Sequence, residues 1–248
     1  MSYFTGVTCI RCGRPLRNGL IFDGCPDCLV EGYPVNYKTV FDYDRLKEKV
    51  KWPLSGSGFW KYKPFFAINS ETNPVSLGEG NTPLLHLKKL GEALGLNNLY
   101  IKDESRNPTW SYKDRLCSVA VTRAVQEGAE VITISTTGNH GASTAAYAAA
   151  AGIPCVVFTV PQVPDVMKTL MQSYGAYVVA LPKPEDRWTI MRECVNQLGW
   201  FPTSGYVSPP IGSNPYGIDG YKTIAFEIYE ELNTTPQFVA IPTAYGDG

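Results

Sequence analysis

From about residue 99 onward, short apolar runs alternate along the chain with longer amphipathic stretches. A short apolar run closed by Gly or Pro indicates a strand, and apolar positions repeating every three to four residues indicate a helix. The predicted strands are residues 99–102, 130–135, 154–160, 177–181 and 238–241, and the predicted helices are residues 113–127, 141–151, 164–174, 184–197 and 220–232. This alternation predicts a three-layer α/β fold on a largely parallel sheet.

Two further segments lie outside this alternating pattern. Residues 37–62 are rich in aromatic and charged side chains and predict one helix at residues 42–50, which the Trp52-Pro53 pair ends. Residues 201–216 form a long segment with four prolines. A loop of this length in a compact domain is usually functional or crosses between lobes.

The composition is that of a globular protein. Hydrophobic residues make up 44% of the 248 positions, and 22 Lys and Arg face 23 Asp and Glu, for a net charge of -1. No run approaches the roughly 18 uncharged apolar residues of a membrane span, and residues 1–19 lack the apolar stretch of a secretory signal. The basic runs are short and interrupted, so we expect a cytoplasmic protein with no nucleic-acid or membrane partner.

Four of the seven cysteines form two close pairs near the start of the chain. Cys9 and Cys12 make one Cys-x2-Cys unit, and Cys25 and Cys28 make the other. This spacing allows four thiolates to surround one Zn²⁺ tetrahedrally, in a closed structural site. Two disulfides or four free thiols are the alternative, although a reducing compartment and the paired spacing favour metal.

The segment around these cysteines has the features of a zinc ribbon, and ribbons serve either as binding modules or as structural supports. Its nearby charges are mixed: Arg11, Arg14 and Arg17 against Asp23, Asp27 and Glu31. A module that binds nucleic acid or a protein partner is therefore one possibility. We favour a structural support that packs on the larger body.

Lys113 lies in the run Ser-Tyr-Lys-Asp-Arg, between a predicted strand and a predicted helix. The start of a helix favours anions and disfavours an ammonium group. Together with the adjacent Arg115, this placement favours a neutral, nucleophilic amine. Taken alone, an ordinary surface lysine is the better explanation of the position.

The run Ser-Thr-Thr-Gly-Asn-His-Gly at residues 135–141 follows a predicted strand and opens a predicted helix. Hydroxyl groups and backbone amides at a helix N-terminus suit a carboxylate or a phosphate. A helix cap needs only one such hydroxyl, so the three hydroxyls with Asn139 and His140 favour an anion site over an ordinary cap.

Two glycine-containing segments are ambiguous by themselves. Residues 78–84 read Gly-Glu-Gly-Asn-Thr-Pro-Leu, and residues 241–248 run from an apolar segment into Thr-Ala-Tyr-Gly-Asp-Gly. A glycine loop after a strand can bind a phosphate through its amides, but it can also be only a turn.

Together, these segments resemble fold-type II pyridoxal-phosphate enzymes, the group with the tryptophan synthase β-like fold, and the nearest similarity is to threonine synthase. The resemblance extends from about Cys9 to Gly248. It rests on residues 78–84, on Lys102-Asp103-Glu104 with Asn107-Pro108-Thr109, on residues 111–115, on Thr137-Gly138-Asn139, and on Asn214-Pro215-Tyr216 through Gly220-Tyr221-Lys222-Thr223. Archaeal-type threonine synthases and cysteate synthases also carry a four-cysteine ribbon.

The resemblance implies roles for individual residues. Lys113 would hold pyridoxal phosphate through a Schiff base and later act as a base, and Asn139 would bind the 3-oxygen of the pyridine ring. The substrate carboxylate would be held by Ser135, Thr136, Thr137 and His140. The cofactor phosphate site would be formed by Ala244, Tyr245, Gly246, Asp247 and Gly248.

The resemblance also implies an organisation of the chain. Residues 1–36 would form the zinc ribbon, residues 37–116 and 217–248 part of the large cofactor domain, and residues 117–216 the small α/β domain. Members of the family continue for a hundred or more residues past the phosphate loop. We therefore expect a fold that is incomplete at its C-terminus, and a homodimer for the full-length protein.

Three functions follow. The first is a lyase that acts on an amino acid, threonine synthase, which converts O-phosphohomoserine and water to threonine and phosphate. The second is a serine or threonine dehydratase or a cysteate synthase, and His140 after Asn139 is more similar to the dehydratases. The third is a non-catalytic binding protein. The predicted phosphate loop also differs from that of the family. Family members have more glycines in this loop, whereas this chain has the bulky Tyr245 and the negatively charged Asp247.

Overall fold

The computed structural model describes residues 2–17, 19, 21–243 and 246. Its central sheet has four parallel strands in the order β7-β6-β5-β8. These strands are β5 (Ile132–Ser135), β6 (Cys155–Thr159), β7 (Tyr177–Ala180) and β8 (Phe201–Pro202). The chain builds the sheet outward from β5 to β7 and then returns to place β8 on the other side of β5.

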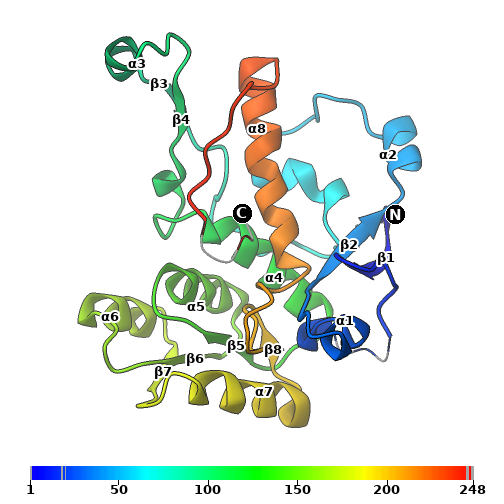
Figure 1. The fold of residues 1–248 in the computed structure, drawn as a ribbon, viewed down its shortest axis with the longest axis vertical. Coiled ribbons are helices and arrows are strands. Elements are labelled where there is room, and N and C mark those ends of the chain that lie inside the picture. The colour runs from blue at the N-terminus through cyan, green and yellow to red at the C-terminus, as the bar shows by residue number, and fades with distance from the viewer. Residues whose placement is uncertain (1, 18, 20, 244–245, 247–248) are drawn as a thin grey trace.

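Helices cover both faces of this sheet (Figure 1). The helices α5 (Asn139–Ala151) and α6 (Asp165–Ser173) lie on one face, and α7 (Asp186–Leu198) lies on the other, as the return to β8 requires. The predicted three-layer α/β fold is thereby confirmed. The predicted strands and helices between residues 130 and 198 are all present, with ends that differ by one or two residues.

Small side chains allow α5 to pack closely on the sheet. Ala145 and Ala148 are fully buried. At Gly141 a Cβ atom would lie 2.4 Å from Cγ2 of Thr136 and 2.6 Å from Sδ of Met171, so a larger residue does not fit. The run of small residues therefore sets the distance between the helix and the sheet.

The helix α4 (Lys113–Gln126) packs against α5 and, on its other side, against a short 3₁₀ helix, η4 (Gly217–Tyr221), which continues into α8 (Lys222–Leu232). Residues 116–122 of α4 are completely buried. The long predicted helix at residues 220–232 is confirmed, with its first turn tightened to 3₁₀ geometry. Thus α4 is the central helix of the molecule, enclosed on several sides.

The four cysteines lie in a small N-terminal unit beside the end of the sheet that β8 forms (Figure 1). It contains an antiparallel pair, β1 (Phe4–Cys9) and β2 (Tyr37–Phe41), with η1 (Ile21–Asp23) and α1 (Pro26–Val30) between them. Asn36 Nδ2 donates to the Ser213 carbonyl at 2.9 Å, which joins this unit to the long 201–216 loop. The predicted helix at residues 42–50 is α2 (Tyr43–Lys49), and η2 (Phe59–Phe65) follows it.

A narrow arm extends from the body (Figure 1). It consists of the antiparallel strands β3 (Leu84–His86) and β4 (Tyr100–Lys102) with α3 (Lys88–Leu94) at the tip, and η3 (Glu104–Arg106) follows β4. The arm leaves several large apolar side chains exposed: Leu85, Leu90, Leu94, Leu96 and Ile101. A thin two-stranded element has no second layer of its own to bury them.

One predicted strand is wrong. Residues 238–241 form no strand, and Phe238, Val239 and Ile241 are exposed. A strand needs a neighbour to pair its backbone groups, and no strand in the described part of the chain pairs with this segment. Apolar composition alone therefore misled the prediction.

None of the helices in the described part of the chain has both the length and the apolar character needed to cross a membrane.

Candidate active site

The strand order places a topological switch point at the carboxyl end of β5. Strand order reverses between β5 and β8, and in open parallel sheets such a switch point is where ligands bind. The loop after β5 begins at Ser135, whose backbone N–H donates to Oγ of Ser204 at 3.1 Å, just past β8. The predicted anion-binding run at residues 135–141 therefore lies at the switch point.

The N-terminus of α5 lies at this switch point, and no side chain caps it. The cap residue is Gly138, which has no side chain to accept from the first-turn amides. Thr137 and Asn139 on either side of it are exposed. First-turn amides that no side chain satisfies, together with the partial positive charge of the helix end, suit an anionic group.

His140 lies in the first turn of α5 and is buried. Its burial, with a contribution from the positive charge of Lys113, lowers the pKa of the imidazole to about 3. Within the described residues, Nε2 of His140 and Oγ of Ser135 are buried without a hydrogen-bond partner. A neutral imidazole and a hydroxyl with unused bonding capacity are groups that a polar ligand can satisfy.

Lys113 is the first residue of α4 and is partly buried. Its Nζ donates a hydrogen bond of 3.1 Å to Oη of Tyr221, the last residue of η4. The same nitrogen lies 4.5 Å from the ring centroid of Tyr112 and 5.4 Å from that of Tyr221. Two aromatic rings and one hydroxyl thus hold the ammonium group.

Asp114 joins the starts of α4 and α5. Its carboxylate accepts from Thr109 Oγ1 at 2.5 Å, from the Thr109 N–H at 2.7 Å and from Ser143 Oγ of α5 at 2.6 Å. Complete burial raises the pKa of this carboxyl, against the effect of these hydrogen bonds. The hydrogen bond between Asp114 and Ser143 holds the starts of α4 and α5 together. Lys113, the residue before Asp114, therefore lies close enough to His140 to lower the pKa of its imidazole.

The third residue of α4, Arg115, is fully buried and uses its guanidinium completely. It makes two-point contacts with Glu104 at 2.7 and 2.8 Å and with Glu227 of α8 at 2.7 and 2.8 Å. The hydroxyls of Thr223 and Thr82 accept further bonds at 2.7 and 3.1 Å. Because two carboxylates balance its charge, Arg115 braces the base of α4 and is not a lone cation beside Lys113.

The Gly-Glu-Gly-Asn segment is anchored by the buried side chain of Glu79. Glu79 accepts from Trp60 Nε1 at 2.9 Å, Ser118 Oγ at 2.5 Å and Tyr147 Oη at 2.8 Å. A cavity of about 430 Å³ lies between this segment and residues 57–60, and its lining does not include Lys113. Through Ser118 of α4 and Tyr147 of α5, Glu79 connects these two helices.

Of the five residues predicted to bind the cofactor phosphate, Ala244, Tyr245, Asp247 and Gly248 lie outside the described residues. Gly246 is described and has a φ of 85°, a left-handed backbone that favours glycine.

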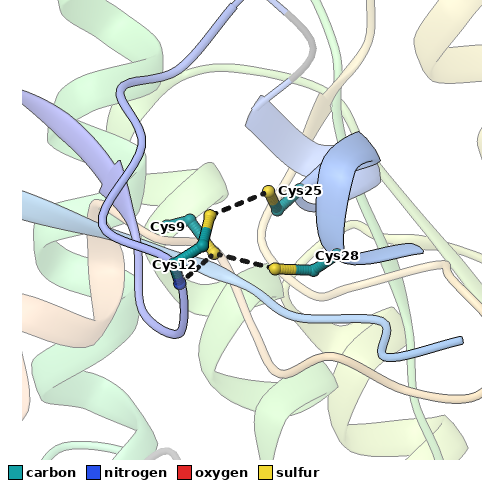
Figure 2. A group of neighbouring side chains, drawn as sticks. All are labelled: Cys9, Cys12, Cys25 and Cys28. Atoms are coloured by element: carbon teal, nitrogen blue, oxygen red, sulfur yellow. Dashed lines mark hydrogen bonds between the residues drawn. The ribbon is translucent and has the colours of Figure 1, made fainter. Parts of the chain in front are cut away.

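The four cysteines converge in the N-terminal unit, and Figure 2 shows their sulfurs facing one another. All four Sγ atoms lie within 4.8 Å of each other, with Cys9 to Cys28 at 3.7 Å and Cys12 to Cys25 at 3.8 Å. Four thiolates at about 2.3 Å from a tetrahedral Zn²⁺ are separated by about 3.8 Å. A disulfide needs about 2.05 Å, so the geometry fits zinc and does not fit two disulfides.

The family model for "Pyridoxal-phosphate dependent enzyme" matches residues 75–248. The chain belongs to this family of pyridoxal-phosphate dependent enzymes, of fold type II, which confirms the resemblance seen in its sequence.

Among curated proteins, the threonine synthase of Methanocaldococcus jannaschii is 36% identical over 242 residues, which cover 94% of this chain and 56% of that protein. The threonine synthase of Methanosarcina acetivorans is 33% identical over 95% of this chain and 56% of its own length. That of Bacillus sp. (strain ULM1) is 38% identical over 76% of this chain and 54% of its own length. The chain thus spans a little over half the length of these relatives.

Solved structures show the same fold. Diaminopropionate ammonia lyase of Escherichia coli in apo form has a TM-score of 0.56 at 22% identity, over 68% of this chain and 56% of that one. Maize serine racemase has a TM-score of 0.55 at 21% identity, over 62% of this chain and 45% of that one.

The structure adds functional candidates that the sequence reasoning did not identify. Tyr221 contacts Lys113, and Glu104 and Glu227 balance Arg115. The sequence signal for Tyr221 was its place in the Gly-Tyr-Lys-Thr run. That run contributed to the family resemblance, but no role was assigned to the tyrosine. For Glu104 and Glu227, separations of 11 and 112 residues from Arg115 concealed the link.

Proposed function

We propose that this chain carries the cofactor and substrate-carboxylate sites of a threonine synthase, which converts O-phosphohomoserine and water to threonine and phosphate. One observation carries the proposal most: the uncapped N-terminus of α5 lies at the switch point of a parallel sheet, and Lys113 is near enough to His140 in its first turn to influence the pKa of that imidazole. The named relatives that share 33–38% identity with the chain support threonine synthase over other pyridoxal-phosphate enzymes.

The side chains of this site fit pyridoxal phosphate. In our proposal Lys113 bonds the cofactor and later moves a proton at the substrate Cα. Asn139 binds the 3-oxygen of the ring, and residues 244–248 bind the phosphate. When bound, pyridoxal phosphate supplies the electron sink for the electron pair of the broken Cα bond.

The substrate carboxylate would bind at the start of α5. Ser135, Thr136 and Thr137 offer hydroxyls there, and the first-turn amides lack a side-chain cap. His140 supports this role because a pKa of about 3 keeps its imidazole neutral, and its Nε2 is unsatisfied within the described residues. The anion would thus be held by hydrogen bonds and the helix end rather than by a histidinium.

For the cysteines, we propose one structural Zn²⁺ held by Cys9, Cys12, Cys25 and Cys28. The sulfur spacing supports it, and four thiolate ligands leave no open position for catalysis. We further propose the division into a ribbon of residues 1–36, a large-domain part of residues 37–116 and 217–248, and a small domain of residues 117–216, with a homodimer for the complete enzyme.

The first test is covalent trapping of the cofactor. Purified chain is mixed with pyridoxal phosphate and reduced with borohydride, and peptide mass spectrometry locates the phosphopyridoxyl group. We expect it on Lys113 and expect Lys113→Ala to lose it. Lys89→Ala, at an exposed lysine of α3, is the matched control and should label as the parent does. Label spread over exposed lysines, with none on Lys113, would refute the cofactor assignment.

The second test identifies the leaving group. The protein, loaded with cofactor, is given O-phosphohomoserine, L-serine and L-threonine separately, and phosphate and ammonia are measured. We expect phosphate from O-phosphohomoserine, lost in Lys113→Ala. Ammonia from serine or threonine without phosphate release would instead indicate a dehydratase.

A further inference from the structure

Tyr221 occupies an unusual position relative to the reactive amine of the proposed site. It is 6% exposed, and its Oη lies 3.1 Å from Nζ of Lys113. The lysine donates and the tyrosine oxygen accepts, so the hydroxyl holds the amine in place. The ring of Tyr112 lies across the same nitrogen and 5.0 Å from the ring of Tyr221, at an angle of 45°.

The backbone around Tyr221 leaves it little freedom to move away. A Cβ atom at Gly220 would lie 2.0 Å from the Arg115 carbonyl oxygen, and one at Gly217 would lie 2.9 Å from Cγ of Leu116. The 3₁₀ turn η4 is thus in direct contact with the first turns of α4, where Lys113 begins the helix. Only glycine at these positions allows this approach.

Polar contacts fix the same turn from both ends. Asn214 Oδ1 accepts from the N–H groups of Tyr216 and Gly217 at 2.9 and 3.0 Å. Asp219 accepts from Thr39 of β2 and forms an ion pair with Lys222. Because these contacts hold η4 in place, the Tyr221 hydroxyl has a fixed position from which it can hold the side chain of Lys113.

We propose that Tyr221 is a positioning residue of this site: its hydroxyl receives the Nζ of Lys113 whenever that amine is not bonded to the cofactor, and so sets its position. The proposal rests on the proposed function for its role in turnover. The Lys113–Tyr221 contact itself is independent of that function. Before cofactor binding, and again when the amine has been released, the tyrosine oxygen keeps the amine of Lys113 at the start of α4.

Competitive acetylation tests this contact in the chain as it stands. Trace acetic anhydride labels all lysines, and peptide mass spectrometry gives the label on Lys113 relative to the exposed Lys89 of the same molecule. Near neutral pH we expect Tyr221→Phe to raise this ratio about fivefold, because the amine is no longer held by a hydrogen bond worth about 1 kcal/mol. Tyr216→Phe, which changes a hydroxyl of the same segment away from Lys113, should leave the ratio unchanged.

The pH profile separates this role from a merely structural one. The ratio between Tyr221→Phe and the parent should be largest at low pH, where ammonium predominates, and should approach one at high pH. A wider access path to Lys113 would instead raise labelling equally at all pH values. Such a uniform rise, or no rise at all, would overturn the proposal.

Trapping with pyridoxal phosphate keeps the two proposals distinguishable. If Lys113 traps the cofactor but Tyr221→Phe leaves acetylation unchanged, the proposed function stands and the role of Tyr221 fails. If Tyr221→Phe produces the pH-dependent rise while Lys113 traps no cofactor, the contact is real and the proposed function fails.

Discussion

The cysteine cluster and the Lys113 site are assembled in opposite ways. The cluster takes its four sulfurs from residues 9–28, and short turns bring them together. The Lys113 site draws on β5, α4, α5 and η4, so its partners extend from residue 112 to residue 221. The first depends on local spacing and a ligand, whereas the second depends on the topology of the whole sheet. Each should therefore fail under a different perturbation.

The largest effect should follow removal of metal from the cluster. Structural zinc in finger peptides contributes about 10–16 kcal/mol of binding free energy near pH 7. We expect one zinc per chain, and expect Cys25→Ser or a strong chelator to abolish amide-exchange protection in β1 and β2. Elemental analysis and hydrogen exchange check this.

Cys194→Ser on α7, outside the cluster, is the matched control and should keep its zinc. Protection of β1 and β2 that survives chelation would mean that the N-terminal unit folds without metal.

Next in size is Arg115→Met, which breaks the brace beneath the Lys113 site. It leaves the buried carboxylate of Glu227 and the partly buried carboxylate of Glu104 without their Arg115 partner, a loss of about 3–5 kcal/mol. Urea denaturation measures the change in unfolding free energy. Arg192→Met, at a half-exposed ion pair with Asp23, should cost less than about 1 kcal/mol. Equal effects of the two substitutions would contradict the bracing role.

The third prediction concerns acid. The pKa of His140 is lowered to about 3 in the folded chain, chiefly by burial, so between about pH 6.5 and pH 3 the unfolded chain binds a proton that the folded chain does not. Stability should therefore fall as the pH is lowered through this window, by up to about 1.4 kcal/mol per pH unit from this group.

His140→Gln should remove that contribution, so its unfolding free energy should fall by about 2 kcal/mol less than the parent's between pH 6.5 and pH 4.5. Parallel urea titrations at the two pH values measure the difference. His86→Gln, at an exposed histidine of the arm, is the control. Identical pH dependence in the parent and in His140→Gln would contradict the buried, neutral state.

The smallest effect tests the connection between the two regions. Thr39 Oγ1 of β2 donates to both oxygens of Asp219 at 2.8 and 2.6 Å, two residues before Tyr221. Thr39→Val should reduce the unfolding free energy by about 1 kcal/mol, since a buried carboxylate loses one donor. Thr5→Val, at an exposed hydroxyl on the partner strand, should have almost no effect. A null result at Thr39 would mean that the two regions are energetically independent.

The same contrast explains what the sequence could predict. The cysteine spacing and the alternating strands and helices depend on nearby residues, and both appear in the structure. Lys113 at a helix start and the polar run after β5 were also recognisable locally. The contact of Lys113 with Tyr221 joins residues 108 positions apart and was not. The failed strand at residues 238–241 shows the same limit, because pairing depends on a neighbour that composition does not reveal.

The guanidinium of Arg115 also constrains how the chain can vary between species. Each of its nitrogens is already committed to Glu104, Glu227, Thr82 or Thr223, so no single substitution that removes the polar group at one of these positions leaves the others satisfied. A neutral change at one position would require a matching change at a second, on a different helix or loop. We therefore expect these five positions to be replaced together or not at all, whatever substrate the surrounding loops come to accept.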